Sequence, residues 1–237
     1  AQRRTKLESI RLTPRLQAIA DQVTQDARLA DIGTDHAHLP IWLLQQGRIR
    51  QAVASDIREG PLARAKENAA RHGYLEQIAL RLGAGLERVT PDECDTISIA
   101  GMGGETIAGI LHDAPWTAQG QHTLLLQPMT MIAELRQALY RGGYAIERET
   151  LCREDHRRYV VLTVRGGAEA QDVPLDACCL SPALLQAVGA KDYLTHLLTR
   201  ERRALEGLRC AKEADAVRLR IQEQTVQTLE QELEGLS

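Results

Sequence analysis

Short apolar runs alternate with amphipathic segments along most of the chain. Thr13-Pro14 precedes apolar residues at helical spacing, which predicts a leading helix with an N-cap and a first-turn proline. The apolar runs predict strands at residues 29–33, 52–56, 78–83, 95–101 and 123–127. The intervening segments predict helices at residues 37–46, 61–72, 105–112 and 132–140. This alternation is typical of a parallel sheet covered by helices on both faces.

Two more strand candidates, residues 144–151 and 158–164, follow one another without a helix between them. They are therefore expected to pair antiparallel at the edge of the sheet. The predicted fold class is α/β, a Rossmann-like seven-stranded sheet arranged as in class I methyltransferases. Dehydrogenase-type folds share the first half of this arrangement.

The composition changes after residues 166–174, whose glycines and charges indicate a linker or an edge loop. Residues 182–236 are rich in helix formers, and their last apolar positions have the three-four-three spacing of a two-heptad seam, at Val226, Leu229, Leu233 and Leu236. We expect a C-terminal α-helical coiled-coil hairpin, with a single helix docked on the sheet as the alternative. The predicted domains are residues 1–170 and 171–237.

Cysteine usage and hydropathy restrict the class of protein. The five cysteines contain no Cys-x-x-Cys pair, so neither a metal site nor a disulfide framework is expected. The N-terminal residues lack the apolar core of a signal peptide, and no stretch is long and apolar enough to span a membrane. These features predict a cytoplasmic protein that makes no membrane contact.

Basic residues are clustered, although the net charge of -3 argues against binding nucleic acid through overall charge. The first cluster lies near the N-terminus, around the single acid Glu8, and comprises Arg3, Arg4, Lys6, Arg11 and Arg15. The second cluster comprises Arg153, Arg157 and Arg158. Each cluster taken alone is typical of solvated surface. If the two share one face, they would suit a polyanionic partner.

The turn after the first strand carries the first chemical signal. In a doubly wound sheet the ligand sits over the carboxyl ends of the first strands. Dinucleotide binders need Gly-x-Gly-x-x-Gly there for close approach of a pyrophosphate, whereas Gly33-Thr-Asp-His-Ala-His38 has one glycine. The carboxylates of Asp31 and Asp35 suit a cationic adenosine ligand without phosphates, such as S-adenosylmethionine. The alternative for Asp35 is an N-cap of the next helix.

The ends of the second and third strands fit the rest of such a ligand. Asp56 closes the second strand at about the 20-residue distance from the turn that a ribose-binding acid shows. Ile57 follows it directly. The Gly83-Ala-Gly85 loop after the third strand would hold adenine through backbone and apolar contacts, with a simple turn as the alternative.

Ala100-Gly-Met-Gly-Gly104 follows the fourth predicted strand. Its glycines leave backbone N–H groups accessible and allow a large flat group to approach closely. Phosphate binding is the rival interpretation, but no lysine follows as in a P-loop. We interpret the string as a pocket floor, with Met102 beneath the sulfonium and the methyl acceptor.

The fifth predicted strand ends in Gln127-Pro128, where a side-chain amide could hydrogen-bond a base edge or simply end the strand. His36 and His38 could act as bases, although a histidine at a helix N-terminus is more often structural. With no Phe, two Trp and five Tyr in the chain, stacking of a base would depend on Tyr159, Trp42 or an arginine plane.

Four strings together resemble the bacterial tRNA (adenine(22)-N(1))-methyltransferase family over roughly residues 12–164. They are Leu29-Ala-Asp-Ile-Gly-Thr-Asp-His-Ala-His-Leu-Pro40, Ile99-Ala-Gly-Met-Gly-Gly104, Leu126-Gln-Pro128, and Arg153-Glu-Asp155 with Tyr159. The resemblance implies a class I methyltransferase domain with a coiled-coil hairpin. It also implies S-adenosylmethionine as methyl donor and a tRNA substrate methylated at N1 of an adenine in the D-arm region.

The expected site follows from the motifs and the resemblance together. The cofactor-binding residues are expected to be Asp31, Gly33, Thr34, Asp35, His36, Asp56, Ile57, Gly83, Ala84, Gly85, Ala100, Gly101 and Gly103. The expected catalytic residues are Asp35, Gln127 and Met102. The expected substrate-binding residues are Arg11, Arg15, His38, Arg153 and Tyr159. Three positions depart from the family pattern, in which tyrosine is common at His38, a polar residue at Ala84 and asparagine at Met129.

The hypothesis is direct methyl transfer to adenine N1, whose ring lone pair is the nucleophile, so positioning should dominate catalysis. Asp35 or Gln127 would bind the exocyclic amine. The alternatives are a small-molecule methyltransferase with a dimerising helical tail and a non-catalytic binder. The expected partner is tRNA, with no metal, and the expected state is a monomer or a weak homodimer.

Overall fold

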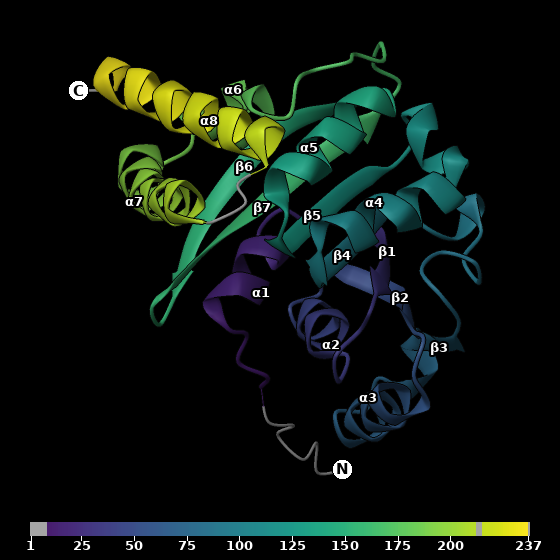
Figure 1. Ribbon diagram of the computed structural model, residues 1–237. Coiled ribbons are helices and arrows are strands. Elements are labelled where there is room, and N and C mark those ends of the chain that lie inside the picture. The colour runs from purple at the N-terminus through teal and green to yellow at the C-terminus, as the bar shows by residue number, and fades with distance from the viewer. Residues whose placement is uncertain (1–8, 212–214, 237) are drawn as a thin grey trace, which may run out of the picture.

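A computed structural model describes residues 9–211 and 215–236, and within these ranges the chain forms a seven-stranded sheet of order β3-β2-β1-β4-β5-β7-β6 (Figure 1). The strands are β1 (Ala27–Ile32), β2 (Ile49–Asp56), β3 (Ile78–Leu82), β4 (Thr96–Gly103), β5 (Thr123–Thr130), β6 (Tyr144–Glu154) and β7 (Arg157–Gly166). Strands β1 to β5 are parallel, whereas β7 pairs antiparallel with β5 and β6. The predicted seven-stranded α/β sheet and its antiparallel edge pair are confirmed.

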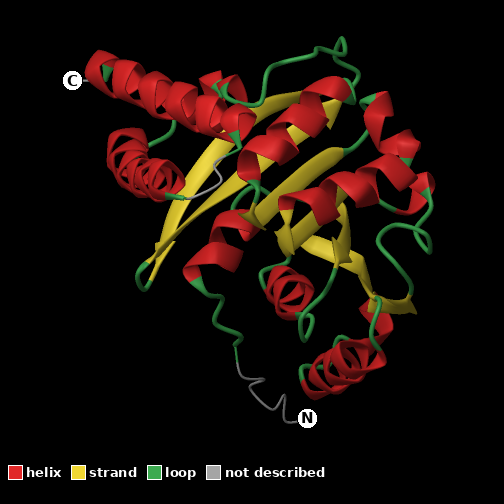
Figure 2. Ribbon diagram, viewed as in Figure 1, coloured by secondary structure: helices red, strands yellow, loops and turns green. Residues whose placement is uncertain are grey.

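Helices cover both faces of the sheet (Figure 2). They are α1 (Pro14–Ala20), α2 (His38–Gln45), α3 (Glu59–Arg71), α4 (Gly104–Asp113), α5 (Ile132–Arg141), α6 (Pro182–Leu185), α7 (Ala190–Cys210) and α8 (Ala216–Gly235). The short 3-10 turns are η1 (Leu75–Gln77), η2 (Pro91–Glu93), η3 (Pro115–Gln119) and η4 (Ala177–Cys179). The leading helix is confirmed, because the Thr13 side chain caps α1 by accepting from Leu16 N.

Two apolar cores lie on the two faces of the sheet. Helices α1, α2 and α3 pack on one core, and α4 and α5 on the other. Along β5, Leu125 belongs to the first core while Leu124 and Leu126 belong to the second. Successive side chains of a strand point to opposite faces, so a central strand covered on both sides is apolar at most positions. This explains the continuous apolar runs in the sequence.

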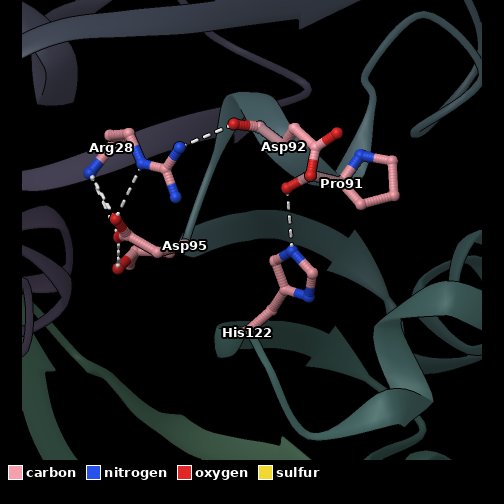
Figure 3. Close-up of polar contacts among 6 residues, drawn as sticks. Arg28, Pro91, Asp92, Asp95 and His122 are labelled. Atoms are coloured by element: carbon pink, nitrogen blue, oxygen red, sulfur yellow. Dashed lines mark hydrogen bonds and ion pairs between the residues drawn. The ribbon is translucent and has the colours of Figure 1, made fainter.

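A polar cluster joins the starts of the central strands at the amino edge of the sheet (Figure 3). Arg28 Nε lies 3.2 Å from Asp95 Oδ2, and Arg28 Nη1 donates to the Asp92 carbonyl at 2.6 Å. His122 Nε2 lies 3.1 Å from the Pro91 carbonyl oxygen. The loop before β4 is therefore tied to both β1 and β5, which leaves the opposite, carboxyl edge for binding.

The C-terminal helices form an antiparallel pair with an apolar cluster of its own. Arg202 of α7 bonds Glu230 of α8, while Arg209, further along α7, bonds Glu223, earlier in α8. Because later residues of α7 pair with earlier residues of α8, the two helices run antiparallel, which confirms the predicted hairpin. Its coiled-coil character stays a prediction, and residues 212–214 lie outside the described ranges.

A buried ion pair attaches this hairpin to the sheet. Arg136 of α5 and Glu149 of β6 make two hydrogen bonds, of 2.8 and 2.7 Å. Arg136 also donates to the carbonyls of Cys178 and Cys179, and the Ser181 hydroxyl donates to Glu149. A buried charge pair is stable only when its remaining donors and acceptors are satisfied, as they are here. The network orients the segment that leads into the hairpin.

No helix in the described part of the chain is long and apolar enough to cross a membrane.

Candidate active site

The end of β1 places a buried carboxyl group beside unpaired hydroxyls. Burial raises the pKa of Asp31 to about 6, an effect that the nearby Thr34 and Ser98 hydroxyls oppose and the Asp35 charge reinforces. Within the described residues, Thr34, Ser98 and Ser55 each have a buried side-chain oxygen without a hydrogen bond of normal geometry. Unpaired polar atoms are costly, so a bound polar ligand would stabilise this end of the sheet.

The turn after β1 depends on its one glycine. Gly33 has φ +72°, and its N–H and that of Thr34 both donate to the Ser55 carbonyl of β2, at 2.8 and 3.0 Å. A Cβ atom at Gly33 would collide with the methyl group of Met102. Met102, from the end of β4, therefore lies against the β1 turn, and the first and fourth strand ends form one surface.

Asp35 is not the N-cap of the following helix, so that alternative is wrong. The cap of α2 is Ala37, which has φ +54° and makes no side-chain cap bond. The Asp35 side chain is 85% exposed and lies 3.1 Å from His36 Nε2. The His36 ring stacks on that of His38, and burial, followed by the charge of His36, lowers the pKa of His38. The turn thus presents an exposed carboxylate, in contact with His36, beside two stacked imidazoles.

Asp56 and two exposed apolar side chains meet at the ends of β2 and β3. Asp56 is buried and accepts from Arg58 N at 2.8 Å, and its own carbonyl accepts from Gly83 N. Ile57 is 67% exposed and Leu82 is 49% exposed. Exposed apolar side chains can pack on a flat ring, and the buried carboxylate beside them can bind the hydroxyl groups of an attached sugar. Sequence patterns did not single out Leu82, although it ends an apolar strand next to a glycine.

The loop after β3 has two different roles. The Gly83 N–H donates to the Asp56 carbonyl and so continues the strand pairing at the end of β2, and Ala84 is exposed. Gly85 has φ +51°, and a Cβ atom there would press on the Ile110 side chain of α4. Gly83 and Ala84 therefore border the candidate site, whereas Gly85 serves the packing of α4.

The glycines after β4 shape the floor of the site, which also includes the half-buried Ala100. Gly101 is exposed with φ +77°, and its N–H donates to Gln127 Oε1 at 3.1 Å. Gly103 is the N-cap of α4. A Cβ atom at Gly104 would collide with the Met131 carbonyl. Close backbone approach explains Gly104, whereas a Cβ atom at Gly101 would lie 3.3 Å from Arg15 Nη1, so Gly101 leaves room for that guanidinium.

Gln127 is fully buried, and its amide group is engaged within the protein. Its Oε1 accepts from Arg15 Nη1 at 2.8 Å as well as from Gly101 N. Its Nε2 donates to the Pro128 carbonyl at 2.8 Å and contacts the Met129 sulfur at 3.6 Å. This geometry fits a residue that positions the glycine loop better than one that contacts a base edge.

Arg15 and Tyr159 are brought together beside Gln127. The Arg15 guanidinium lies 5.9 Å from the centre of the Tyr159 ring. Arg153 donates to a carbonyl of its own hairpin, and Arg11 is exposed before α1. Trp42 instead packs partly buried against the first core. Three further members of the N-terminal basic cluster lie outside the described residues: Arg3, Arg4 and Lys6.

Across residues 9–211 and 215–236, no group of three or more His, Cys, Asp or Glu side chains is arranged to hold a metal ion. The five cysteines are all free.

The sheet order and the site at its carboxyl edge define a Rossmann-like methyltransferase, and the family described as a methyltransferase domain matches residues 12–162. The tRNA (adenine(22)-N(1))-methyltransferase of Bacillus subtilis is 36% identical over 179 residues, which cover 76% of this chain and 74% of that protein. The chain belongs to the tRNA (adenine(22)-N(1))-methyltransferase family.

Solved structures agree with this assignment. The B. subtilis M1A22 tRNA methyltransferase TrmK has a TM-score of 0.76 at 29% identity and covers 96% of this chain and 98% of its own. A putative tRNA (m1A22) methyltransferase of Streptococcus pneumoniae, in complex with S-adenosyl-L-methionine, has a TM-score of 0.77 at 30% identity. That match covers 94% of this chain and 100% of the other.

Proposed function

We propose that this protein transfers a methyl group from S-adenosylmethionine to N1 of an adenine in tRNA, at position 22 in the D-arm region. The observation that carries the proposal is the juxtaposition of two buried carboxyls, Asp31 and Asp56, at the ends of the adjacent strands β1 and β2. Between and beside them lie a one-glycine turn and exposed apolar side chains, in place of the glycine-rich loop that a pyrophosphate needs.

The residues present fit the cofactor. Asp56 accepts hydrogen bonds from the ribose hydroxyls, and Ile57 and Leu82 pack on the adenine ring. Asp31 pairs with the cationic amino acid moiety, and the unpaired hydroxyl of Thr34 hydrogen-bonds it. The turn residues Gly33 and His36, and the loop residues Gly83, Ala84, Gly101 and Gly103, complete the border of the site.

When bound, S-adenosylmethionine supplies an electrophilic methyl group on a sulfonium. The adenine N1 lone pair is itself the nucleophile, so the protein needs to orient the ring and exclude water. Met102 supplies an apolar wall against the Gly33 turn, and the Gly101 backbone borders it. Asp35 accepts a hydrogen bond from the exocyclic amine and stabilises the positive charge that methylation leaves on the ring.

Gln127 acts as a positioning residue, because its hydrogen bonds all go to other protein groups. Arg15 and Tyr159 lie where the substrate binds. His38, Arg11 and Arg153 are the further substrate-binding residues around the border of the site. Since Arg15 has its charge beside an aromatic ring at the site mouth, it can contact both a base and a phosphate.

The domain division at residues 170 and 171 is supported by the end of β7 at Gly166 and by the separate apolar cluster of the C-terminal helices. The first domain binds the cofactor and the second, a coiled-coil hairpin, assists tRNA binding. A tRNA substrate supports a cytoplasmic location for the protein. One cofactor site is formed within one chain, in line with a monomer or a weak homodimer.

Incubation with methyl-labelled S-adenosylmethionine and an unmodified tRNA transcript, followed by nucleoside mapping, tests the proposal. The expected product is 1-methyladenosine at position 22, and a transcript with guanosine at that position should stay unlabelled. Methylation of another atom or nucleotide would contradict the assignment. A small-metabolite methyltransferase would instead leave tRNA unlabelled and show no salt-sensitive affinity for it.

A further inference from the structure

A groove of about 400 Å³ lies between the end of β5, the β6–β7 hairpin and α7. Its volume is within the roughly 300–1,000 Å³ typical of small-ligand sites. Met129, Leu197 and Tyr159 line it with apolar and aromatic surface, and three arginines line it with positive charge: Arg157, Arg158 and Arg200. The combination of flat apolar surface and guanidinium groups matches a nucleotide, which has a base and a phosphate.

The positive charge of the groove affects its other groups. Burial lowers the pKa of His196, and the charges of Arg158 and Arg200 lower it further. Within the described residues Arg157 makes no ion pair, so its charge is available to a ligand. Arginine is suited to phosphate because its planar fork can donate two parallel hydrogen bonds.

Asp192 of α7 now occupies the fork of Arg158. Its Oδ2 lies 3.0 Å from Arg158 Nε and its Oδ1 lies 3.4 Å from Nη2. The Arg158 side chain is 20% exposed, whereas that of Asp192 is 73% exposed. A phosphate presents the same two-oxygen edge as a carboxylate, so it can take the place of this solvent-facing side chain without moving the arginine.

The groove is continuous with the candidate methylation site. Thr130, which lines the groove, has its hydroxyl 3.3 Å from where a Cβ atom of Gly103 would lie. The Met129 sulfur contacts Gln127, and Arg15 lies over the Tyr159 ring. An RNA strand whose adenine enters at the glycine loop therefore has the groove directly beside it.

We propose that this groove binds the nucleotide next to the methylated adenosine. Its base packs on Met129, Tyr159 and Leu197, and a backbone phosphate binds Arg157 and Arg158 after displacing Asp192. The inference rests on the proposed function, which it deepens by naming a second subsite for the RNA.

Equilibrium binding of fluorescently labelled tRNA over a salt series tests the subsite in the full-length chain. Arg158→Gln should raise the Kd roughly 10-fold and reduce the log–log salt slope by about 0.7–0.9, the effect of losing one phosphate contact. Asp192→Asn should lower the Kd roughly 3-fold, because the phosphate no longer competes with a carboxylate. Arg64→Gln is the matched control, since Arg64 is exposed on α3, at the far end of the molecule from α7 (Figure 1).

The opposite directions of the first two variants separate a binding role from misfolding, because an unfolded protein does not gain affinity. S-adenosylmethionine affinity by calorimetry should be the same in all variants. Steady-state kinetics should show a higher KM for tRNA in Arg158→Gln and a lower one in Asp192→Asn, with kcat within about 2-fold. If Arg158→Gln and Asp192→Asn match Arg64→Gln in tRNA affinity and salt slope, the subsite is wrong. Altered sedimentation with unaltered RNA affinity would equally overturn it, assigning the groove to contact between two copies.

The proposed function fails separately. If the groove variants show the predicted changes in tRNA affinity but the wild-type protein methylates another position, the subsite stands and the assignment to adenine 22 is wrong. Wild-type protein that methylates adenine N1 while both groove variants behave as the control loses only the subsite.

Discussion

Arg15 Nη1 and Gln127 Oε1 lie 2.8 Å apart, although 112 residues separate them in the chain. The same Gln127 oxygen accepts from Gly101 N. A single buried carbonyl therefore joins the first helix, the end of β5 and the glycine loop after β4. The glycine loop that we assign to the reacting groups is therefore held in place by the first helix of the chain, which is distant from it in sequence.

Replacing Gln127 by leucine should lower kcat roughly 100-fold with a smaller change in the Kd for S-adenosylmethionine, because the Gly101 loop loses its acceptor. The unpaired donors of Arg15 and Gly101 should also cost about 1–3 kcal/mol of unfolding free energy. Denaturant titration and single-turnover kinetics measure the two effects. Arg15→Ala combined with Gln127→Leu gives a double-mutant cycle, and strictly additive effects would contradict the contact.

Asp56→Ala should weaken S-adenosylmethionine binding by at least roughly 100-fold, since two hydrogen bonds to a charged acceptor are lost. Isothermal calorimetry measures the affinity, and far-UV circular dichroism should show an unchanged fold. Asp26→Ala, an exposed acid at the opposite edge of the sheet, is the control and should bind normally. Unchanged affinity in Asp56→Ala would show that Asp56 does not bind the ribose.

Ile57→Ala and Leu82→Ala should each reduce cofactor affinity by about 3- to 10-fold while leaving the melting temperature within error. Both side chains are largely exposed in the free protein, so their apolar surface is buried only when an adenine ring covers it. Val188→Ala removes a similar exposed side chain next to α6, which packs on β6 at the opposite side of the sheet from β2 and β3, and should change neither quantity. Equal affinity in all three variants would place the adenine elsewhere.

The affinity for S-adenosylmethionine should rise with pH up to about pH 6 and then level off. Burial raises the pKa of Asp31 to about 6, so below that pH the carboxyl is protonated and cannot pair with a cationic ligand. One linked proton gives a slope of up to roughly tenfold per pH unit. Calorimetry from pH 5 to 8 measures it. Asp31→Asn should bind weakly with no such dependence, and an unaltered pH profile in that variant would exclude Asp31 as the titrating group.

Glu149→Ala should destabilise the protein by about 3–5 kcal/mol, because it leaves the Arg136 guanidinium buried without its counter-ion. The matched control is Glu147→Ala on the same strand, which breaks a half-exposed pair with Arg165 and should cost about 1 kcal/mol or less. Urea titration compares the two. Similar losses in both variants would show that the buried network does not hold the hairpin to the sheet.

Local patterns in the sequence determined the seven strands, the leading helix and the acid at the end of β2. Each of these depends on side-chain periodicity or on neighbours a few residues away, such as Thr13 and Pro14 at the start of α1. The one-glycine turn at Gly33 likewise carries its own signal, because a left-handed backbone conformation favours glycine. The family resemblance depended on the same short strings.

Only the tertiary structure decided which partners the polar side chains have. Gln127 had two equal interpretations in the sequence, and packing against Arg15 and Gly101 engages its amide inside the protein. The groove beside Tyr159 exists because α7 returns to the β6–β7 hairpin, where Arg158 meets Asp192. Hydrogen bonds and ion pairs between distant segments depend on how helices pack on the sheet, and periodicity within a segment carries no information about that packing.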